Sequence, residues 1–174
     1  AHVVSGHFGY TQLGLNLWDG RCALDYLSAR DDVDAARLGC VGCSLGGAMT
    51  TFLAAADPRI RAACISGYLG GTAGPLSQLA TCGSQTLPGL LRWGDRAEVA
   101  GLICPRPLLV QIGRYDATFP SSDALCAYER VRRIYTAAGR ADRLDLDLFE
   151  GCHEINAPPL IAWFERRLRP RHPA

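Results

Sequence analysis

The segment Gly42-Cys43-Ser44-Leu45-Gly46 fits the pattern G-x-S-x-G, which can hold a serine as a nucleophile. It follows a short apolar run and precedes an alanine-rich segment, so a strand before it and a helix after it are expected. In such a tight turn, side chains two residues before and two after the serine would collide, so both positions favour glycine. The N–H of Leu45 would face the oxyanion that develops on a substrate. The alternative is a glycine-rich turn whose serine only caps the helix.

A serine alone is a weak nucleophile, so a base and an orienting acid must accompany it. With this motif the chain order is serine, then acid, then histidine. Two histidines follow Ser44: His153 comes directly after an expected strand, and His172 lies in a basic tail. His153 is therefore the expected base, with a surface loop histidine as the alternative. Asp116, just after another expected strand, is the expected acid; the competitor Asp123 is explained by the dipole of the helix it begins.

The elements that must position these residues alternate between strands and helices. Apolar runs predict strands at residues 37–42, 61–66 and 107–113, and the alternation of Leu with Asp predicts a fourth at 144–149. Helices are expected at 16–30 with Asn16 as its cap, 45–55, 95–102, 121–138 capped by Ser121 or Ser122, and 157–168. Residues 1–15 and 67–94 are expected as loops. This alternation predicts one α/β domain over 1–174, with a mostly parallel sheet and helices on both faces. The carboxyl ends of such strands share one edge, where Ser44, Asp116 and His153 would meet.

Eight segments spread over most of the chain match one group of enzymes in the same order: residues 18–19, 23–27, 37–39, 54–60, 66–69, 87–90, 105–109 and 113–120. With the order Ser44, Asp116, His153, they make the chain resemble the α/β-hydrolases. Within that superfamily it is similar to the acetyl xylan esterase and dienelactone hydrolase-like group of bacterial esterases. It departs from the dienelactone hydrolases, which use cysteine as nucleophile, because Ser44 holds that place and Cys43 precedes it.

The resemblance implies a serine esterase that cleaves small carboxylic esters, acetylated carbohydrates among them, through an acyl-enzyme. Such chemistry needs no metal and no organic cofactor. One rival is peptidase or amidase activity on the same three residues. The other is a truncated hydrolase-like domain that serves as an interaction module without catalysis.

A full domain of this family has several strands before the first helix expected here, and one oxyanion donor usually comes from an early loop. No such strands are expected in this sequence, and residues 5–9 are a weak substitute for that donor. The strand at 37–42 would then lie at an edge of the sheet, and an apolar edge invites pairing with another chain. We therefore expect a C-terminal portion of the fold whose edge is covered by a homo-oligomer partner or by a missing N-terminal segment.

Eight cysteines are too few for a disulfide scaffold in a chain of 174 residues. Cys40 and Cys43 form one C-x-x-C pair, but a zinc site would need a second pair. Cys43 precedes Ser44 and Cys152 precedes His153. Glucuronoyl esterases, which are similar at the serine turn, have a disulfide beside the catalytic serine and histidine. The resemblance thus allows a disulfide between Cys43 and Cys152, with two separately packed thiols as the alternative.

Aromatic residues on the loops expected at the carboxyl edge could bind acyl or sugar groups, or could simply pack. These candidates for substrate binding are Tyr68, Trp93, Tyr115 and Phe119. Trp18 and Trp163 lie on expected helices and should belong to the core.

The composition excludes several functions. The 18 basic and 17 acidic residues give a net charge of +1, so binding to nucleic acid or to an anionic membrane surface is not expected. No apolar run approaches the roughly 18 residues of a membrane span. All 18 basic residues are arginine, which excludes Schiff-base chemistry on lysine. The first residues lack the features of a secretory signal, which favours the cytoplasm without fixing the compartment.

Overall fold

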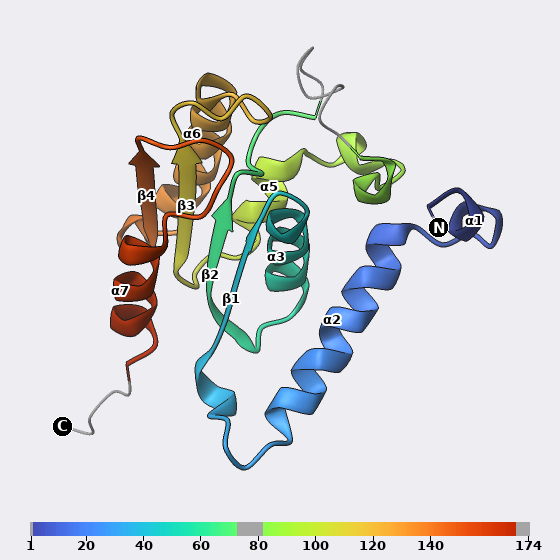
Figure 1. Ribbon diagram of the computed structural model, residues 1–174, viewed down its shortest axis with the longest axis horizontal. Helices are drawn as coiled ribbons and strands as arrows, with labels where there is room; N and C mark the ends of the chain where they lie inside the picture. The colour runs from blue at the N-terminus through green and yellow to red at the C-terminus, as the bar shows by residue number, and fades with distance from the viewer. Residues whose placement is uncertain (1, 73–81, 170–174) are drawn as a thin grey trace.

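The computed structural model describes residues 2–72 and 82–169. Four strands form one sheet in the order β1-β2-β3-β4, and every neighbouring pair runs parallel (Figure 1). The strands are β1 (Leu38–Cys43), β2 (Ile60–Ser66), β3 (Leu108–Gly113) and β4 (Leu144–Phe149). The α/β class and the parallel sheet are confirmed, and each strand lies within one residue of its predicted limits.

Helices cover both faces of the sheet, as predicted (Figure 1). Their bounds are α1 (His2–His7), α2 (Gln12–Ser28), α3 (Leu45–Ala56), α5 (Arg96–Gly101), α6 (Ser121–Ala137) and α7 (Ala157–Arg167). Short 3-10 turns lie at Ala35–Arg37, Gly83–Gln85, Leu90–Arg92 and Ala141–Arg143. Helices α3, α5 and α6 pack on one face, with α2 outside α3, and α7 packs on the other.

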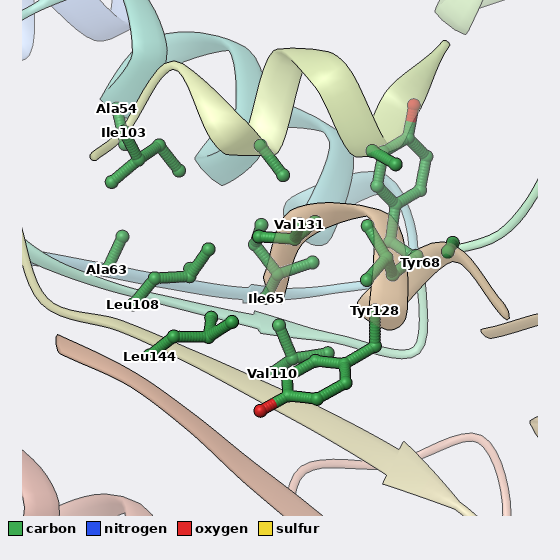
Figure 2. Packing of buried hydrophobic residues seen from close by; sticks show 14 of the residues in the cluster. Ala54, Ala63, Ile65, Tyr68, Ile103, Leu108, Val110, Tyr128, Val131 and Leu144 are labelled. Carbon is green, nitrogen blue, oxygen red and sulfur yellow. The ribbon is translucent and has the colours of Figure 1, made fainter. Parts of the chain in front are cut away.

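The larger core lies between the sheet and the helices α3, α5 and α6. Ile65 of β2 and Val110 of β3 point toward Val131 and Tyr128 of α6, and all four are buried (Figure 2). Burying an aliphatic side chain of this size contributes about 1.5–3 kcal/mol relative to leaving it exposed. Because helices cover both faces, β3 is buried along its whole length. The central strands thus form a rigid base for the loops at their carboxyl ends.

The predicted loop over residues 1–15 is wrong, because α1 and the first turn of α2 lie there. Asn16 is inside α2 rather than at its cap; Thr11 caps the helix, its hydroxyl accepting the Gly14 N–H at 2.9 Å. Leu13 is buried and continues the helical spacing of Leu17 backward by one turn. Gly14 and Asn16, which favour loops and helix caps, lie between these leucines and hid that turn from the sequence pattern.

The predicted serine cap of α6 is also wrong. The helix begins at Ser121, its cap position is Pro120, and Ser122 lies in the first turn. Gly139 follows the helix with a φ of +67°, the left-handed conformation expected of glycine at that end. The expected loop at 67–94 contains two 3-10 turns, and residues 73–81 of it lie outside the described chain.

The two helical tryptophans differ in their environments. Trp163 of α7 is buried against the second face of the sheet, as predicted, and donates its indole N–H to Asp145 at 2.6 Å. Trp18 is 65% exposed, so its predicted place in the core is wrong. Helix α2 buries Leu13 and Leu24, and Trp18 remains in solvent.

Strand β1 lies at one edge of the described sheet and pairs there with β2 alone. Val41 in its middle is 44% exposed, which agrees with the expected edge strand. That a second copy or a further segment covers this edge stays a prediction. Among the described residues, no helix is both long enough and apolar enough to cross a membrane.

Candidate active site

Ser44 joins the end of β1 to the start of α3 in a strained turn. Its φ of +58° and ψ of −118° make it the one described residue other than glycine with a positive φ. Such a conformation costs on the order of 1–3 kcal/mol and persists only where neighbours enforce it. The Ser44 N–H donates to the Ser66 carbonyl at 3.1 Å, which holds the turn against β2. Within the described chain the Ser44 hydroxyl forms no capping hydrogen bond, so it does not serve α3 as a cap.

The tightness of this turn explains one of its two glycines. A Cβ at position 42 would overlap the carbonyl of Gly46, so only glycine fits there. A Cβ at Gly46 itself would meet no described atom within 4 Å outside its own helix, so the expected collision at that second position is wrong. The close approach is made by the backbone of Gly46, not by the space beside its Cα.

Asp116 and His153 are brought together by the loops that follow β3 and β4. His153 Nδ1 lies 2.8 Å from Asp116 Oδ2. The other carboxylate oxygen accepts the N–H groups of Thr118 and Phe119, both at 2.8 Å. Because an ionised carboxylate only accepts hydrogen bonds, the proton lies on Nδ1 and leaves Nε2 free to accept one. The Asp116 side chain is 1% exposed and that of His153 is 29% exposed, so the base can reach solvent while its partner cannot.

Ser44 and His153 lie on neighbouring turns at the same edge of the sheet. No hydrogen bond between their side chains occurs among the residues described. Catalytic contacts of this kind are often long without substrate and shorten when it binds. Leu45 is the first residue of α3, where backbone N–H groups have no acceptor within the helix.

The competing acid Asp123 has another partner: its carboxylate accepts the Gly71 N–H at 3.1 Å. His172 lies outside the described residues. In the part of the chain that the structure describes, no group of three or more His, Cys, Asp or Glu side chains could hold a metal ion.

The four aromatic candidates fall into two groups. Phe119 is buried and stacks on His153, with ring centroids 5.7 Å apart and planes 12° apart. Tyr68 is buried behind Phe119, with the Arg96 guanidinium 4.6 Å from its ring centroid. These two therefore support the histidine by packing rather than forming an open wall. Tyr115 is exposed and donates to Glu150 at 2.7 Å, and Trp93 is 89% exposed, so packing does not explain either.

Two residues that the sequence did not single out connect the elements of the site. Besides holding the Ser44 N–H, Ser66 donates its hydroxyl to the Glu154 carbonyl at 2.8 Å. Gly67 has a φ of +51°, and a Cβ there would lie 3.0 Å from His153 Nδ1. The end of β2 thus ties the serine turn to the histidine loop. The sequence signal was two small residues at the end of a buried strand, within the matching segment 66–69.

Ser66→Ala tests this tie. Losing the hydroxyl frees the Glu154 carbonyl, so we expect His153 to be held less precisely and kcat for an ester to fall by about 10- to 100-fold. KM should change little because Ser66 is buried beneath the site. Steady-state kinetics beside the exposed control Ser122→Ala measure this. Equal kcat in both variants would show that the tie does not position the histidine.

The cysteines beside the site are free thiols, so the disulfide between Cys43 and Cys152 is wrong and two separate thiols are correct. Burial raises the pKa of the Cys43 thiol, and the charges of Asp116 and Glu154 raise it further. A thiol is nucleophilic only as the thiolate. Cys43 therefore stays protonated near neutral pH and does not compete with Ser44.

Comparisons with known proteins bear on the fold of the chain. The chain is 29% identical over 143 residues to "Putative hydrolase YtaP" of Bacillus subtilis (strain 168), covering 77% of this chain and 46% of that protein. It superposes on the solved structure of Methylesterase BT1017 with a TM-score of 0.71 and 24% identity, over 89% of this chain and 35% of that one. The chain has an α/β-hydrolase fold. No family model matches the sequence.

A second structure with the α/β-hydrolase fold is that of a "putative acetyl xylan esterase (BF1801)" from Bacteroides fragilis NCTC 9343. Its TM-score is 0.69 at 18% identity, over 86% of this chain and 40% of that one. The fold that the resemblance implied is thereby confirmed. The chain spans less than half the length of each of these three proteins.

Proposed function

We propose that this chain carries the active site of a serine hydrolase that cleaves small carboxylic esters. The observation that carries the proposal is the hydrogen bond between Asp116 and His153, on loops beside the strained turn of Ser44. A buried carboxylate that keeps the proton on Nδ1 leaves Nε2 able to act as a general base, as a serine hydrolase requires. The similarity to proteins named as esterases supports ester substrates.

The reaction follows from the roles of these groups. The Ser44 oxygen attacks the ester carbonyl carbon while His153 Nε2 takes the hydroxyl proton, and Asp116 stabilises the imidazolium. The N–H of Leu45 donates to the oxyanion of the tetrahedral intermediate. As the intermediate collapses, the carbon–oxygen bond to the alcohol breaks and His153 returns the proton to the alcohol. Water, deprotonated by His153, then attacks the acyl group on Ser44 and releases the acid.

We propose that the substrates carry small acyl or alkoxy groups, with acetylated carbohydrates as the first class to examine. The support is the naming of two similar structures, one as a methylesterase and one as an acetyl xylan esterase. The methyl and acetyl groups are both small, so a site that binds either one does not need to enclose a long acyl or alkyl chain.

The experiment is to treat the purified chain with a fluorophosphonate and measure its intact mass. We expect one covalent adduct that is lost in Ser44→Ala and kept in the exposed control Ser122→Ala. A folded chain without an adduct would overturn the proposal and favour a domain without catalytic activity. An adduct together with cleavage of anilides but not of acetyl or methyl esters would replace esterase by amidase activity.

A further inference from the structure

A concave surface lies at the amino ends of the strands, whereas Ser44 lies at their carboxyl ends. It has a volume of about 890 Å³, and seven of its twelve lining residues are arginine. Arg37 and Arg143 stand directly before β1 and β4, and Arg106 lies two residues before β3. We call this surface the arginine groove. Because it sits at the amino ends of the strands, it is separate from the loops that carry Asp116 and His153.

Carboxylates neutralise only part of the groove. Three arginines have acidic partners within 4.0 Å: Arg37 with Asp34, Arg143 with Asp142, and Arg167 with Asp145. The other four are Arg61, Arg106, Arg140 and Arg169. Across the described residues, these four have no carboxylate oxygen within 4.0 Å of their guanidinium nitrogens. The chain as a whole is almost neutral, so this local excess of positive charge is not a general property of its surface.

Arg106 forms the fixed floor of the groove. Its guanidinium is half-buried and donates to the carbonyls of Asp57 at 3.0 Å, Ile60 at 2.8 Å and Ala54 at 2.5 Å. Burial is the main cause that lowers the pKa of Arg106; the charge of Arg61 also lowers it, while Tyr135 and Asp57 act in the opposite direction. The free energy of these like charges would fall if an anion lay between them.

We propose that the arginine groove binds a small organic anion with two or more phosphate or carboxylate groups. Guanidinium groups pair with the oxygens of both through two parallel hydrogen bonds. The volume falls in the range of sites for small organic ligands, roughly 300–1,000 Å³, and is far larger than one inorganic ion needs. Several unpaired arginines favour a ligand with several negative groups over one with a single charge.

The test is titration calorimetry with the whole chain and two probes, metal-free adenosine triphosphate and trigalacturonate, at one ionic strength set with sodium chloride. These probes separate phosphate from carboxylate as the recognised group. We expect at least one to bind with a Kd below about 1 mM. Arg61→Gln/Arg140→Gln should weaken that binding by about tenfold or more, since both charges lie in the groove.

Arg92→Gln/Arg133→Gln is the matched control, because it removes the same charge from positions outside the groove. Arg106 is left intact since it holds backbone carbonyls of the fold. Binding of neither probe would overturn the proposal. Equal weakening by the two double variants would also overturn it, because binding would then follow net charge. Neither readout depends on ester hydrolysis.

Discussion

Replacing Ser44 with alanine is expected to lower kcat for an acetyl ester by about a millionfold, which leaves only the roughly thousandfold or greater acceleration that binding and the oxyanion donor supply. The alanine variant keeps the turn but has no oxygen to attack the carbonyl, so no acyl-enzyme forms. Steady-state hydrolysis of a chromogenic acetyl ester measures the effect. Circular dichroism and thermal unfolding show whether the variant is folded.

The same experiment includes His153→Ala and the double variant Ser44→Ala/His153→Ala. Residues that act as one unit lose their function together, so the double variant should be no slower than either single one. Two losses that multiply in the double variant would contradict a shared mechanism. Substantial activity in Ser44→Ala would place the nucleophile elsewhere.

Asp116→Asn is expected to lower kcat by about ten-thousandfold. The asparagine amide no longer offers the charged acceptor that keeps the proton on His153 Nδ1, so Nε2 is protonated for much of the time and cannot accept the Ser44 proton. KM should change much less than kcat, because Asp116 is buried behind the histidine. Steady-state kinetics over a range of pH measure both constants.

Asp123→Asn is the matched control for this prediction. It makes the same change in a carboxylate that contacts the Gly71 N–H and not His153. We expect its kcat to stay within a few-fold of the starting value. If Asp123→Asn were the slower variant, the acid assigned from the loop after β3 would be incorrect.

The limits of the strands could be predicted almost to the residue, and the central strands β2 and β3 most simply, because they are buried. Apolar runs such as Leu108 to Ile112 occur where helices cover both faces of a sheet. Helix α1 and the first turn of α2 were missed because their apolar positions are few and are interrupted by glycine and polar residues. The start of a helix is hard to predict where few side chains are buried, as in α2, which buries Leu13 and Leu24.

The candidate site divides in the same way. The approach of Asp116 to His153 could be predicted, because loops at the carboxyl ends of parallel strands meet. The positioning role of Ser66 could not be predicted, because it depends on β2 lying next to β1. A local sequence motif does not show which strands are neighbours in a sheet. Of the two alternatives for Cys43 and Cys152, the structure has separate thiols, because being next to Ser44 and His153 in the chain does not by itself bring two sulfur atoms into bonding distance.

The strained backbone at Ser44 places the stability of the fold in conflict with the proposed catalytic role of the serine. Glycine would adopt that conformation at less cost, so the amino acid that best suits the backbone there is not the one that carries a hydroxyl. Selection for heat resistance alone would therefore favour loss of the nucleophile. Stabilising substitutions in this chain should be made at other positions, and Ser44 should be kept. The strain at this turn offsets part of the free energy of folding that the core contributes.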